Sequence, residues 1–321
     1  MRVVTLLIAV LACICAPVAA EMSTVQNKPF TIVTTFPFGT FDLIARKFGE
    51  KITEATNQSI IVDARPSAGG IVATTTAARA KPDGHTMLLT TANLSIAKSL
   101  YRKLPYDREN ALRPLAQIVQ TPNIIVVRSD SPYRNLGDLL AAAQASPEKL
   151  SYASLGVGSF QHLAMELMKK QFDFGMMHVP YGGSSQAWLA LLGGDIDVYA
   201  TNISEAIPNI DTGKVRALAI TSNRRSPILP DLPTIAELTG KTDFEVVGWI
   251  GFLAPKATPD LMVEKMAKII TDTAKTEEMR GWLEKEGFLL SAAGPEQFKV
   301  ILDKDERHWA DIIQQLGIKA D

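Results

Sequence analysis

The sequence predicts an α/β protein built of two lobes, each a mainly parallel sheet flanked by helices. Strand-like and helix-like patterns alternate along most of the 321 residues, an order that implies right-handed crossovers between parallel strands. This length is too great for one ordinary α/β layer and comfortable for two lobes. Hydrophobic residues make up 46% of the chain, so each lobe can bury a core of its own.

The first third of the chain shows the alternation most clearly. Residues 31–36 are β-branched or aromatic, as strands prefer, and residues 41–55 repeat apolar side chains at helical spacing. Strands are also predicted at 59–63 and 86–90, on either side of an alanine-rich helix that ends at Ala80. We expect these strands to form the sheet of the first lobe.

The rest of the chain repeats the alternation of strands and helices in a second lobe and then returns to the first lobe. Further strands are predicted at 123–127, 150–154, 177–179, 196–200 and 217–220. Further helices are predicted at 136–145, 160–170, 186–192, 259–276 and 295–316. Residues 244–253 form a long apolar run, which we interpret as the strand that returns to the first lobe. The first lobe then takes residues 21–124 and 247–321, and the second takes 125–246.

The first 20 residues differ from the rest. One arginine is followed by an apolar stretch and by small residues ending at Ala20, which is typical of a secretory signal peptide cleaved after Ala20. A retained membrane anchor is one alternative, because the run nearly reaches spanning length. Lipoprotein anchoring through Cys13, at the end of a loose lipobox, is a lesser one. We predict an exported protein that begins near residue 21.

Composition excludes several classes of function. Both cysteines, Cys13 and Cys15, lie in the predicted signal peptide, so the mature chain has no disulfide and no catalytic thiol. The formal net charge is −1, without the basic excess expected of a nucleic-acid-binding protein. Histidine, cysteine and acidic residues form no cluster with metal-ligand spacing. We therefore predict a monomer with no cofactor, no metal and no nucleic-acid partner.

Three loops share one design at the point where a strand ends and a helix begins. They are residues 38–40, 156–159 and 182–185, and each combines glycine with a hydroxyl at an expected N-cap. A helix N-terminus offers unpaired N–H groups and a partial positive charge, and such loops gather at the carboxyl edge of an open α/β sheet. One such loop alone is usually an ordinary cap. Three together predict a cleft for a small anion.

Catalysis is the weaker interpretation. Ser159 and His162 stand three residues apart around a helix start, which suits capping better than a nucleophile and its base. Asp42 lies in the first turn of a helix, where an acid is favourable in any case. It can equally accept a hydrogen bond from a ligand, and both readings stay open. We find no coherent set of acid, base and nucleophile, and predict that the protein is not an enzyme.

Short motifs run in order along nearly the whole mature chain. They are PFGTFDLIAR at 37–46, RPSAGG at 65–70, PDGHT at 82–86, LPYD at 104–107, GSFQHL at 158–163, HVPYGG at 178–183 and WIGFLAP at 249–255. In this order they resemble the periplasmic solute receptors of the tripartite tricarboxylate transporter family, also called Bug or TctC-type receptors. The resemblance covers both predicted lobes.

The resemblance implies a two-lobed periplasmic binding protein of type II-like fold, which closes on a ligand without turning it over. It implies that a ligand carboxylate is held mostly by backbone amides and ordered water, and is delivered to the membrane subunits of such a transporter or to a sensor. For the carboxylate it indicates Gly39, Thr40, Asp42, Gly183, Ser184 and Ser185. For the far end of the ligand it indicates Asn93, Ser154, Ser159, His162 and Asn202. An exported enzyme on the same scaffold, acting on a small carboxylate, is the alternative.

Two phenylalanines depart from the family pattern. Phe38 replaces the first glycine of the opening pair, and Phe41 stands where a small residue is commoner. If the rings line the cleft, they add flat apolar area, and the ligand is a carboxylate on an apolar body, such as an aromatic or dicarboxylic acid. The other reading is that both rings belong to the core of the lobe, which the helical spacing favours for Phe41.

Overall fold

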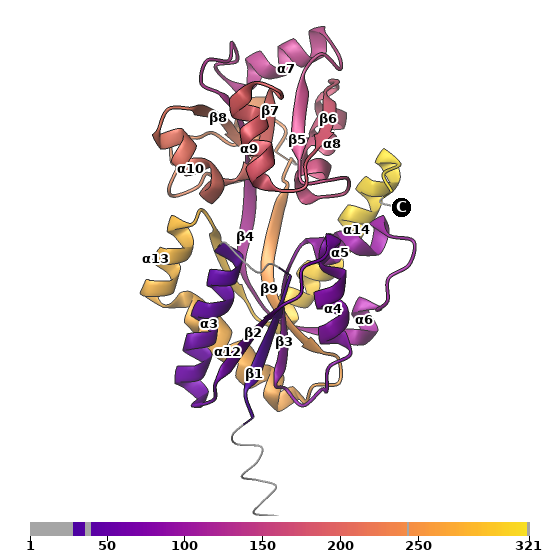
Figure 1. Ribbon diagram of the computed structural model, residues 1–321, viewed down its shortest axis with the longest axis vertical. Helices are drawn as coiled ribbons and strands as arrows, with labels where there is room; N and C mark the ends of the chain where they lie inside the picture. The colour runs from indigo at the N-terminus through magenta and orange to yellow at the C-terminus, as the bar shows by residue number, and fades with distance from the viewer. Residues whose placement is uncertain (1–27, 36–39, 243, 320–321) are drawn as a thin grey trace, which may run out of the picture.

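Two sheets, one above the other, organise the molecule in the computed structural model, which describes residues 28–35, 40–242 and 244–319 (Figure 1). We call the parts built on these sheets the lower lobe and the upper lobe. The predictions for the signal peptide, Phe38 and Gly39 lie outside the described residues. Within the described ranges, no helix combines the length and the apolar character needed to cross a membrane.

The lower sheet has six strands among the described residues, in the order β2-β1-β3-β9-β4-β10. Their bounds are Ile60–Ala64, Phe30–Thr34, Thr86–Thr91, Val247–Pro255, Leu112–Arg128 and Leu289–Ala293, respectively. β1, β2 and β3 pair in parallel, whereas β9 pairs antiparallel with β3 and β4. β10 pairs antiparallel with β4 at the other edge.

The upper sheet shares β4 with the lower one. Its order in the described chain is β8-β4-β7-β5-β6, with β5 at Ser151–Ser154, β6 at Met177–Pro180, β7 at Val198–Asn202 and β8 at Val215–Ile220. β5 pairs in parallel with β6 and β7, but β7 and β8 pair antiparallel with β4. The fold class is therefore as predicted, but the sheets are mixed, and "mainly parallel" was wrong. The reason is that β4 climbs between the lobes, whereas β9 and the upper strands run back down.

Helices cover both sheets (Figure 1). Those of the lower lobe are α3 (Thr40–Thr56), α4 (Ile71–Ala78), α5 (Asn93–Leu100), α6 (Arg108–Ala111), α12 (Asp260–Lys275), α13 (Glu277–Lys285), α14 (Pro295–Leu316) and the short η1 (Ala68–Gly70). Those of the upper lobe are α7 (Leu136–Ala145), α8 (Phe160–Phe172), α9 (Ser184–Gly193), α10 (Ile203–Asp211) and α11 (Ile235–Thr239).

One hydrophobic core crosses between the lobes. Most of its buried residues belong to the upper lobe, but Leu100 of α5 and Trp309 and Ile313 of α14 are part of the same cluster. The two lower helices therefore pack on the upper lobe as well as on their own sheet, and α14 contacts α8. The lobe boundaries given above stay a prediction at the level of single residues.

Candidate ligand-binding site

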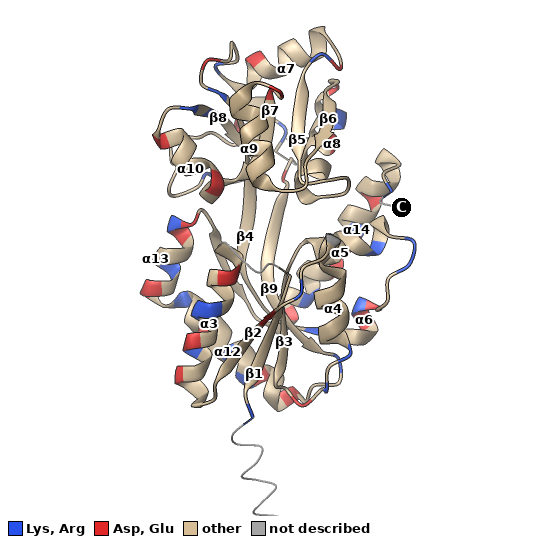
Figure 2. Ribbon diagram, viewed as in Figure 1, with Lys and Arg blue, Asp and Glu red and all other residues tan. Residues whose placement is uncertain are grey.

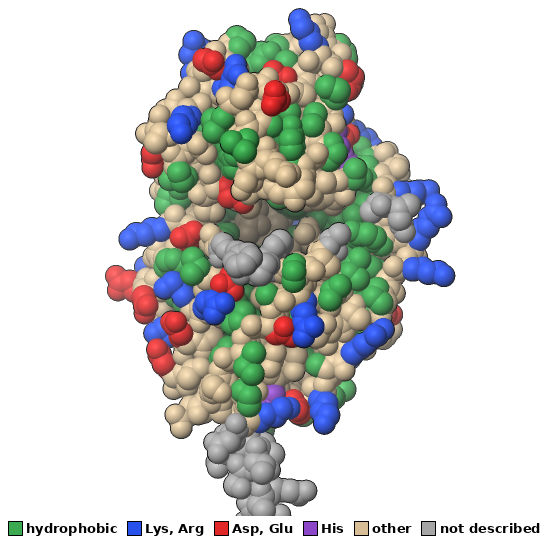
Figure 3. Space-filling model, viewed as in Figure 1, with side chains coloured by type: hydrophobic (Ala, Val, Ile, Leu, Met, Phe, Trp, Pro, Cys, Tyr) green, Lys and Arg blue, Asp and Glu red, His purple; other side chains and the backbone are tan. Residues whose placement is uncertain are grey.

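The molecular surface is hollowed between the two lobes (Figure 3). We call this hollow the cleft. β1, β2 and β3 rise toward it from below, and β5, β6 and β7 descend toward it from above, so their carboxyl ends meet there (Figure 1). The N-termini of α3, α8, α9 and α10 follow these strand ends. This is the edge at which open α/β sheets bind ligands.

The start of α3 forms the lower side of the cleft. The hydroxyl of Thr40 donates a hydrogen bond of 3.2 Å to Glu286, just after α13. Phe41 packs against the hydrophobic core of the lower lobe, which agrees with the interpretation of this ring as a core residue. Whether the ring of Phe38 lines the cleft stays a prediction, because Phe38 lies outside the described residues. Asp42 accepts two hydrogen bonds from Arg46, at 2.7 and 3.2 Å, which supports the reading of Asp42 as a helix-start acid. Its role toward a ligand stays a prediction.

The start of α9 forms part of the upper side. Gly183 occupies the N-cap in an extended conformation, and no side chain caps the helix there. Ser184 and Ser185 begin the first turn, and the whole helix carries no charged residue (Figure 2). By contrast, the hydroxyl of Ser159 caps α8 by accepting a hydrogen bond of 3.3 Å from the backbone N–H of His162, as the capping interpretation predicted. Among the described residues, no side chain therefore accepts a hydrogen bond from the backbone N–H groups that open α9.

Two imidazole rings stack between the first turn of α8 and β6. The rings of His162 and His178 are 4.0 Å apart between centroids, and Nε2 of His178 is 2.6 Å from the hydroxyl oxygen of Ser154. Gly158 N–H donates to Nδ1 of His162 at 3.0 Å, so the neutral ring carries its proton on Nε2. Burial, with the neighbouring imidazole, lowers the pKa of His162 to about 4, and burial also lowers that of His178. Ser154 is fully buried, which does not suit a nucleophile.

The predicted residues fall into two groups. Asn93 begins α5, the helix whose Leu100 reaches the upper lobe at Gly158, where an added Cβ would lie only 2.3 Å from Leu100 Cδ2. This contact brings α5 to the loop that carries Ser159 and the stacked imidazole rings of α8 and β6. The second group gathers at the other side of the cleft, where α9 and α10 begin, and contains Ser184 and Asn202.

Sequence reasoning missed the residue that joins Ser184 to Asn202. Glu205 is partly exposed in the first turn of α10, and its Oε2 accepts a hydrogen bond of 3.1 Å from the hydroxyl of Thr201. Burial raises the pKa of Glu205, and the nearby polar groups of Thr201, Trp188, Ser184 and Asn202 partly oppose that rise. The signal available in the sequence was the spacing Asn202-x-x-Glu205, but this spacing is typical of an ordinary helix cap.

The lobes also touch at this side of the cleft. A Cβ added to Gly287, whose φ is +78°, would lie 2.6 Å from Cβ of Ile203 at the start of α10. The turn that contains Glu286 therefore lies directly against α10, and Thr40 is tied to the same turn. Thr40, Glu286 and the start of α10 thus belong to one contact region.

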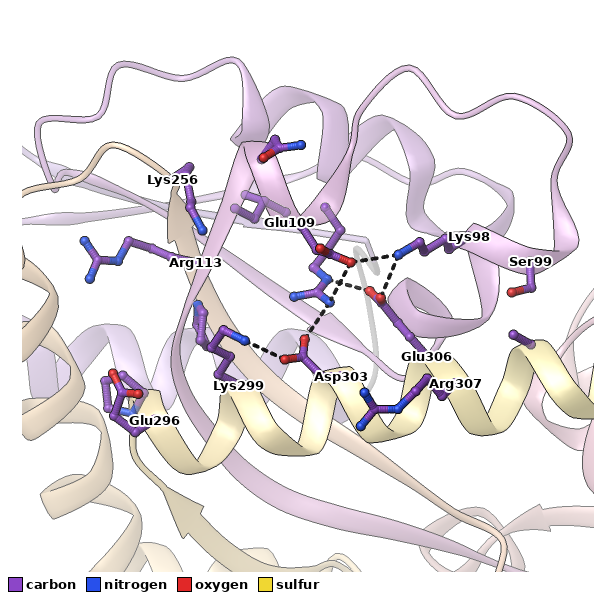
Figure 4. A pocket seen from close by; sticks show the side chains of 16 residues that line it. Lys98, Ser99, Glu109, Arg113, Lys256, Glu296, Lys299, Asp303, Glu306 and Arg307 are labelled. Carbon is purple, nitrogen blue, oxygen red and sulfur yellow. Dashed lines mark hydrogen bonds and ion pairs between the residues drawn. The ribbon is translucent and has the colours of Figure 1, made fainter.

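A separate pocket of about 770 Å³ lies in the lower lobe, between α5, α6 and α14 (Figure 4). It contains none of the predicted site residues. Arg108 donates to Glu306 at 2.5 Å and to Asp303 at 3.0 Å, and Lys98 donates to Glu109 at 2.8 Å. These charges bind one another across helices that are far apart in sequence. We call Lys98, Arg108, Glu109, Lys299, Asp303 and Glu306 the α14 network.

Metal binding has no candidate in the part of the chain that the structure describes. No group of three or more histidine, cysteine, aspartate or glutamate side chains there is arranged to hold an ion.

Comparison with known proteins identifies the family. The family model described as the tripartite tricarboxylate transporter family receptor matches residues 44–318. The UPF0065 protein of the tcbD–tcbE intergenic region of Pseudomonas sp. strain P51 is 34% identical over 303 residues, which are 94% of this chain and 90% of that protein.

Solved structures agree with this result. The periplasmic binding protein BugD is 31% identical, with a TM-score of 0.79 over 91% of this chain and 98% of that one. Rpa4515 of R. palustris, solved with adipate, is 26% identical, with a TM-score of 0.82 over the same shares of 91% and 98%. These similarities span both lobes.

Proposed function

The chain belongs to the tripartite tricarboxylate transporter receptor family, and from this premise we propose that it captures a small organic carboxylate in the cleft. The family consists of solute receptors, and its relatives include a periplasmic binding protein. The predicted signal peptide supports export to the periplasm. We further propose that the loaded receptor delivers its ligand to membrane subunits of a tripartite tricarboxylate transporter or to a sensor.

The uncapped start of α9 is the observation that carries this proposal. No described side chain accepts a hydrogen bond from the backbone N–H groups after Gly183, and α9 follows the carboxyl end of β6, on the cleft. A helix N-terminus combines free donors with a partial positive charge, which suits a carboxylate. The adipate found with Rpa4515 is a dicarboxylate and supports this class of ligand.

The proposed contacts come from both lobes. Thr40 and Asp42 would meet the ligand from below, and Ser184 and Ser185 from above. The far end of the ligand would lie toward the other side of the cleft, near Asn93, Ser154, Ser159 and His162. Asn202, which was also expected at the far end, lies instead with Ser184 where α9 and α10 begin.

The test is to fill the start of α9 with a carboxylate of its own. At Gly183 the backbone is extended and an added Cβ meets nothing within 4 Å, so Gly183→Asp should fold and cap the helix. The new carboxylate would occupy the N–H groups and repel an anionic ligand. After a thermal-shift screen of residues 21–321 against mono-, di- and tricarboxylates and amino acids, calorimetry should show at least about tenfold weaker binding, or 1.4 kcal/mol.

Gly294→Asp is the matched control. Gly294 is the extended, uncapped N-cap of α14, and an added Cβ there also meets nothing within 4 Å. This variant should bind as tightly as the wild type. Equal binding by the Gly183→Asp variant would contradict the proposed role of α9. A screen in which no carboxylate raises the melting temperature would contradict the proposed function itself.

A further inference from the structure

Glu205 has the spacing of a helix cap but does not cap its helix. Asn202 is the N-cap of α10 and Glu205 stands three residues later, yet the side chain of Asn202 makes no capping hydrogen bond. The same spacing at Thr234 and Glu237 forms a complete capping box, with hydrogen bonds of 3.0 and 2.9 Å. The Glu205 carboxyl group is therefore not used by its own helix in the way that Glu237 is.

Among the described residues, the surroundings of Glu205 hold hydrogen-bond donors but no ion-pair partner. The Thr201 hydroxyl is the donor at hydrogen-bond distance, and the causes of the raised pKa of Glu205 include no charged group. The buried indole N–H of Trp188 and the hydroxyl of the fully buried Tyr199 have no hydrogen-bond partner in the described residues. Both stand near this carboxyl group, and burial and the Glu205 charge raise the pKa of Tyr199. Within the part of the chain that the structure describes, Glu205 is thus a carboxyl group with polar neighbours and no ion-pair partner.

Two acidic residues lie on the lower side of the cleft. Glu286 stands in the turn whose Gly287 packs against Ile203 of α10, and its described partner is the hydroxyl of Thr40. Asp42 is already paired with Arg46. Among the described residues, no lysine, arginine or histidine forms an ion pair with Glu205. α9 carries no charge, and the one ionisable side chain of β7 is Tyr199. A purely anionic ligand would bring a second negative charge beside Glu205, which is unfavourable at short distance.

We infer that the ligand carries a cationic nitrogen as well as a carboxylate, and that Glu205 binds this nitrogen. The ligand class is then amino acids or other amino carboxylates. The inference rests on the proposed function: the carboxylate lies at the start of α9, and Ser184 of that turn is a neighbour of Glu205. An ammonium group placed between α9 and α10 donates charge-assisted hydrogen bonds to Glu205. The two ends of one small ligand thereby match two adjacent groups of the upper lobe.

Calorimetry with matched ligand pairs tests this inference. Each pair consists of an amino acid and the acid that lacks only the amino group: glutamate with glutarate, aspartate with succinate, phenylalanine with 3-phenylpropionate, and so on through the standard set. We expect a bound amino acid to exceed its partner at least about tenfold in affinity, because the amino-free acid leaves the Glu205 charge unpaired. Glu205→Gln, which keeps the shape and removes the charge, should abolish this preference.

Glu237→Gln is the control, because Glu237 is an exposed residue in a formed capping box. That variant should keep the wild-type preference. If the amino-free acids bind as well as the amino acids, or if Glu205→Gln keeps the preference, the inference is wrong and the proposed carboxylate receptor stands. If neither member of any pair binds the wild-type protein, the inference is wrong, and the proposed function is wrong as well if no other carboxylate of the screen binds. The wild-type pairs give this answer even if the variant fails to fold.

Discussion

The α14 network and the surroundings of Glu205 are two charged regions with opposite designs. In the α14 network, Arg108 and Glu306 are both almost fully buried, with side chains 5% and 7% exposed, and each has a partner of opposite charge (Figure 4). Around Glu205 the carboxyl group is partly exposed and has a hydroxyl partner but no cation. The first region satisfies its charges from within the chain, and the second does not.

This difference separates the pocket beside α14 from the proposed binding site. The pocket beside the α14 network has a volume of about 770 Å³, ample for a small ligand, but its buried charges already bind one another. A ligand would have to compete with Glu306 for Arg108. At Glu205 no described residue of opposite charge competes with a ligand, because its described hydrogen-bond partner is the hydroxyl of Thr201. A carboxyl group without a described ion-pair partner, just after the carboxyl end of a strand, is therefore a better guide to ligand chemistry than the volume of a cavity.

Breaking the α14 network should produce the largest loss of stability. Arg108→Ala leaves Glu306 buried without its guanidinium partner and removes a partner of Asp303. Removing one member of a buried ion pair typically costs about 3–5 kcal/mol in the free energy of unfolding when the other charge is left without a partner. Lys98 still donates to Glu306 at 3.1 Å, so we expect the loss to lie near the lower end of this range. Urea unfolding at pH 7 measures this change, and ligand affinity of the folded variant should stay as in the wild type.

Lys299→Ala provides the control within the same network. Lys299 pairs with Asp303 at 2.5 Å across one helical turn, but its side chain is 56% exposed. An exposed pair of this kind contributes about 0.3–0.5 kcal/mol. Equal losses from Arg108→Ala and Lys299→Ala would show that burial does not distinguish the two pairs, and the comparison above would fail.

The sequence predicted the positions of the strands and helices better than it predicted which strands pair and which side chains make contact. The β-branched run before residue 36 and the glycine–hydroxyl loops correctly indicated β1 and the starts of α3, α8 and α9. Periodicity reports which face of an element is buried but not which strand lies next to it, so the antiparallel insertion of β9 between β3 and β4 was missed. Local sequence also says nothing of contacts such as Arg108 with Glu306, 198 positions apart.

Glu205 shows why part of the candidate site could not be predicted. Its spacing from Asn202 is the same as that of Glu237 from Thr234, and local sequence alone indicates a capping box at both places. The local contact with Thr201 and the tertiary neighbour Ser184 distinguish the two. The aromatic question at Phe38 stays open, because that residue lies outside the described ranges.

Acid should weaken the upper region through His162. Its pKa in the folded protein, about 4, lies below the ordinary 6.5, so its contribution to stability is present above pH 6.5 and is lost as the pH falls toward 4. By linkage this loss amounts to about 2 kcal/mol at pH 5 relative to pH 8. In His162→Gln, the decrease in the free energy of unfolding between pH 8 and 5 should be smaller by that amount.

Asp305 of α14 should respond in the opposite direction. Burial raises the pKa of Asp305 to about 6, against the ordinary 3.8, so its contribution to stability is present below pH 3.8 and is lost as the pH rises through 6. Between pH 8 and pH 5, protonation of Asp305 adds about 1 kcal/mol to the free energy of unfolding of the wild type. Asp305→Asn lacks this gain, so its free energy of unfolding should fall more steeply than that of the wild type as the pH is lowered. Parallel pH profiles for both variants and the wild type would refute these assignments.

The smallest expected effects decide whether Glu205 is free. Thr234→Ala removes the hydroxyl that caps α11 and should cost about 1 kcal/mol in the free energy of unfolding. Asn202→Ala removes a side chain that makes no capping hydrogen bond, and should cost less than about 0.5 kcal/mol. Matched urea titrations in the absence of ligand measure both changes.

The sign of the difference between these two variants matters more than its size. If Asn202→Ala costs as much as Thr234→Ala, then Asn202 caps α10 in solution, and Glu205, three residues on, is positioned to complete that box. Its carboxyl group would then serve the helix, as Glu237 serves α11, and the reason for assigning it a cationic ligand group would be gone. If Asn202→Ala leaves stability nearly unchanged but weakens ligand binding, the start of α10 contributes to recognition rather than to folding. The two capping sequences would then share a spacing but differ in function because of what surrounds them.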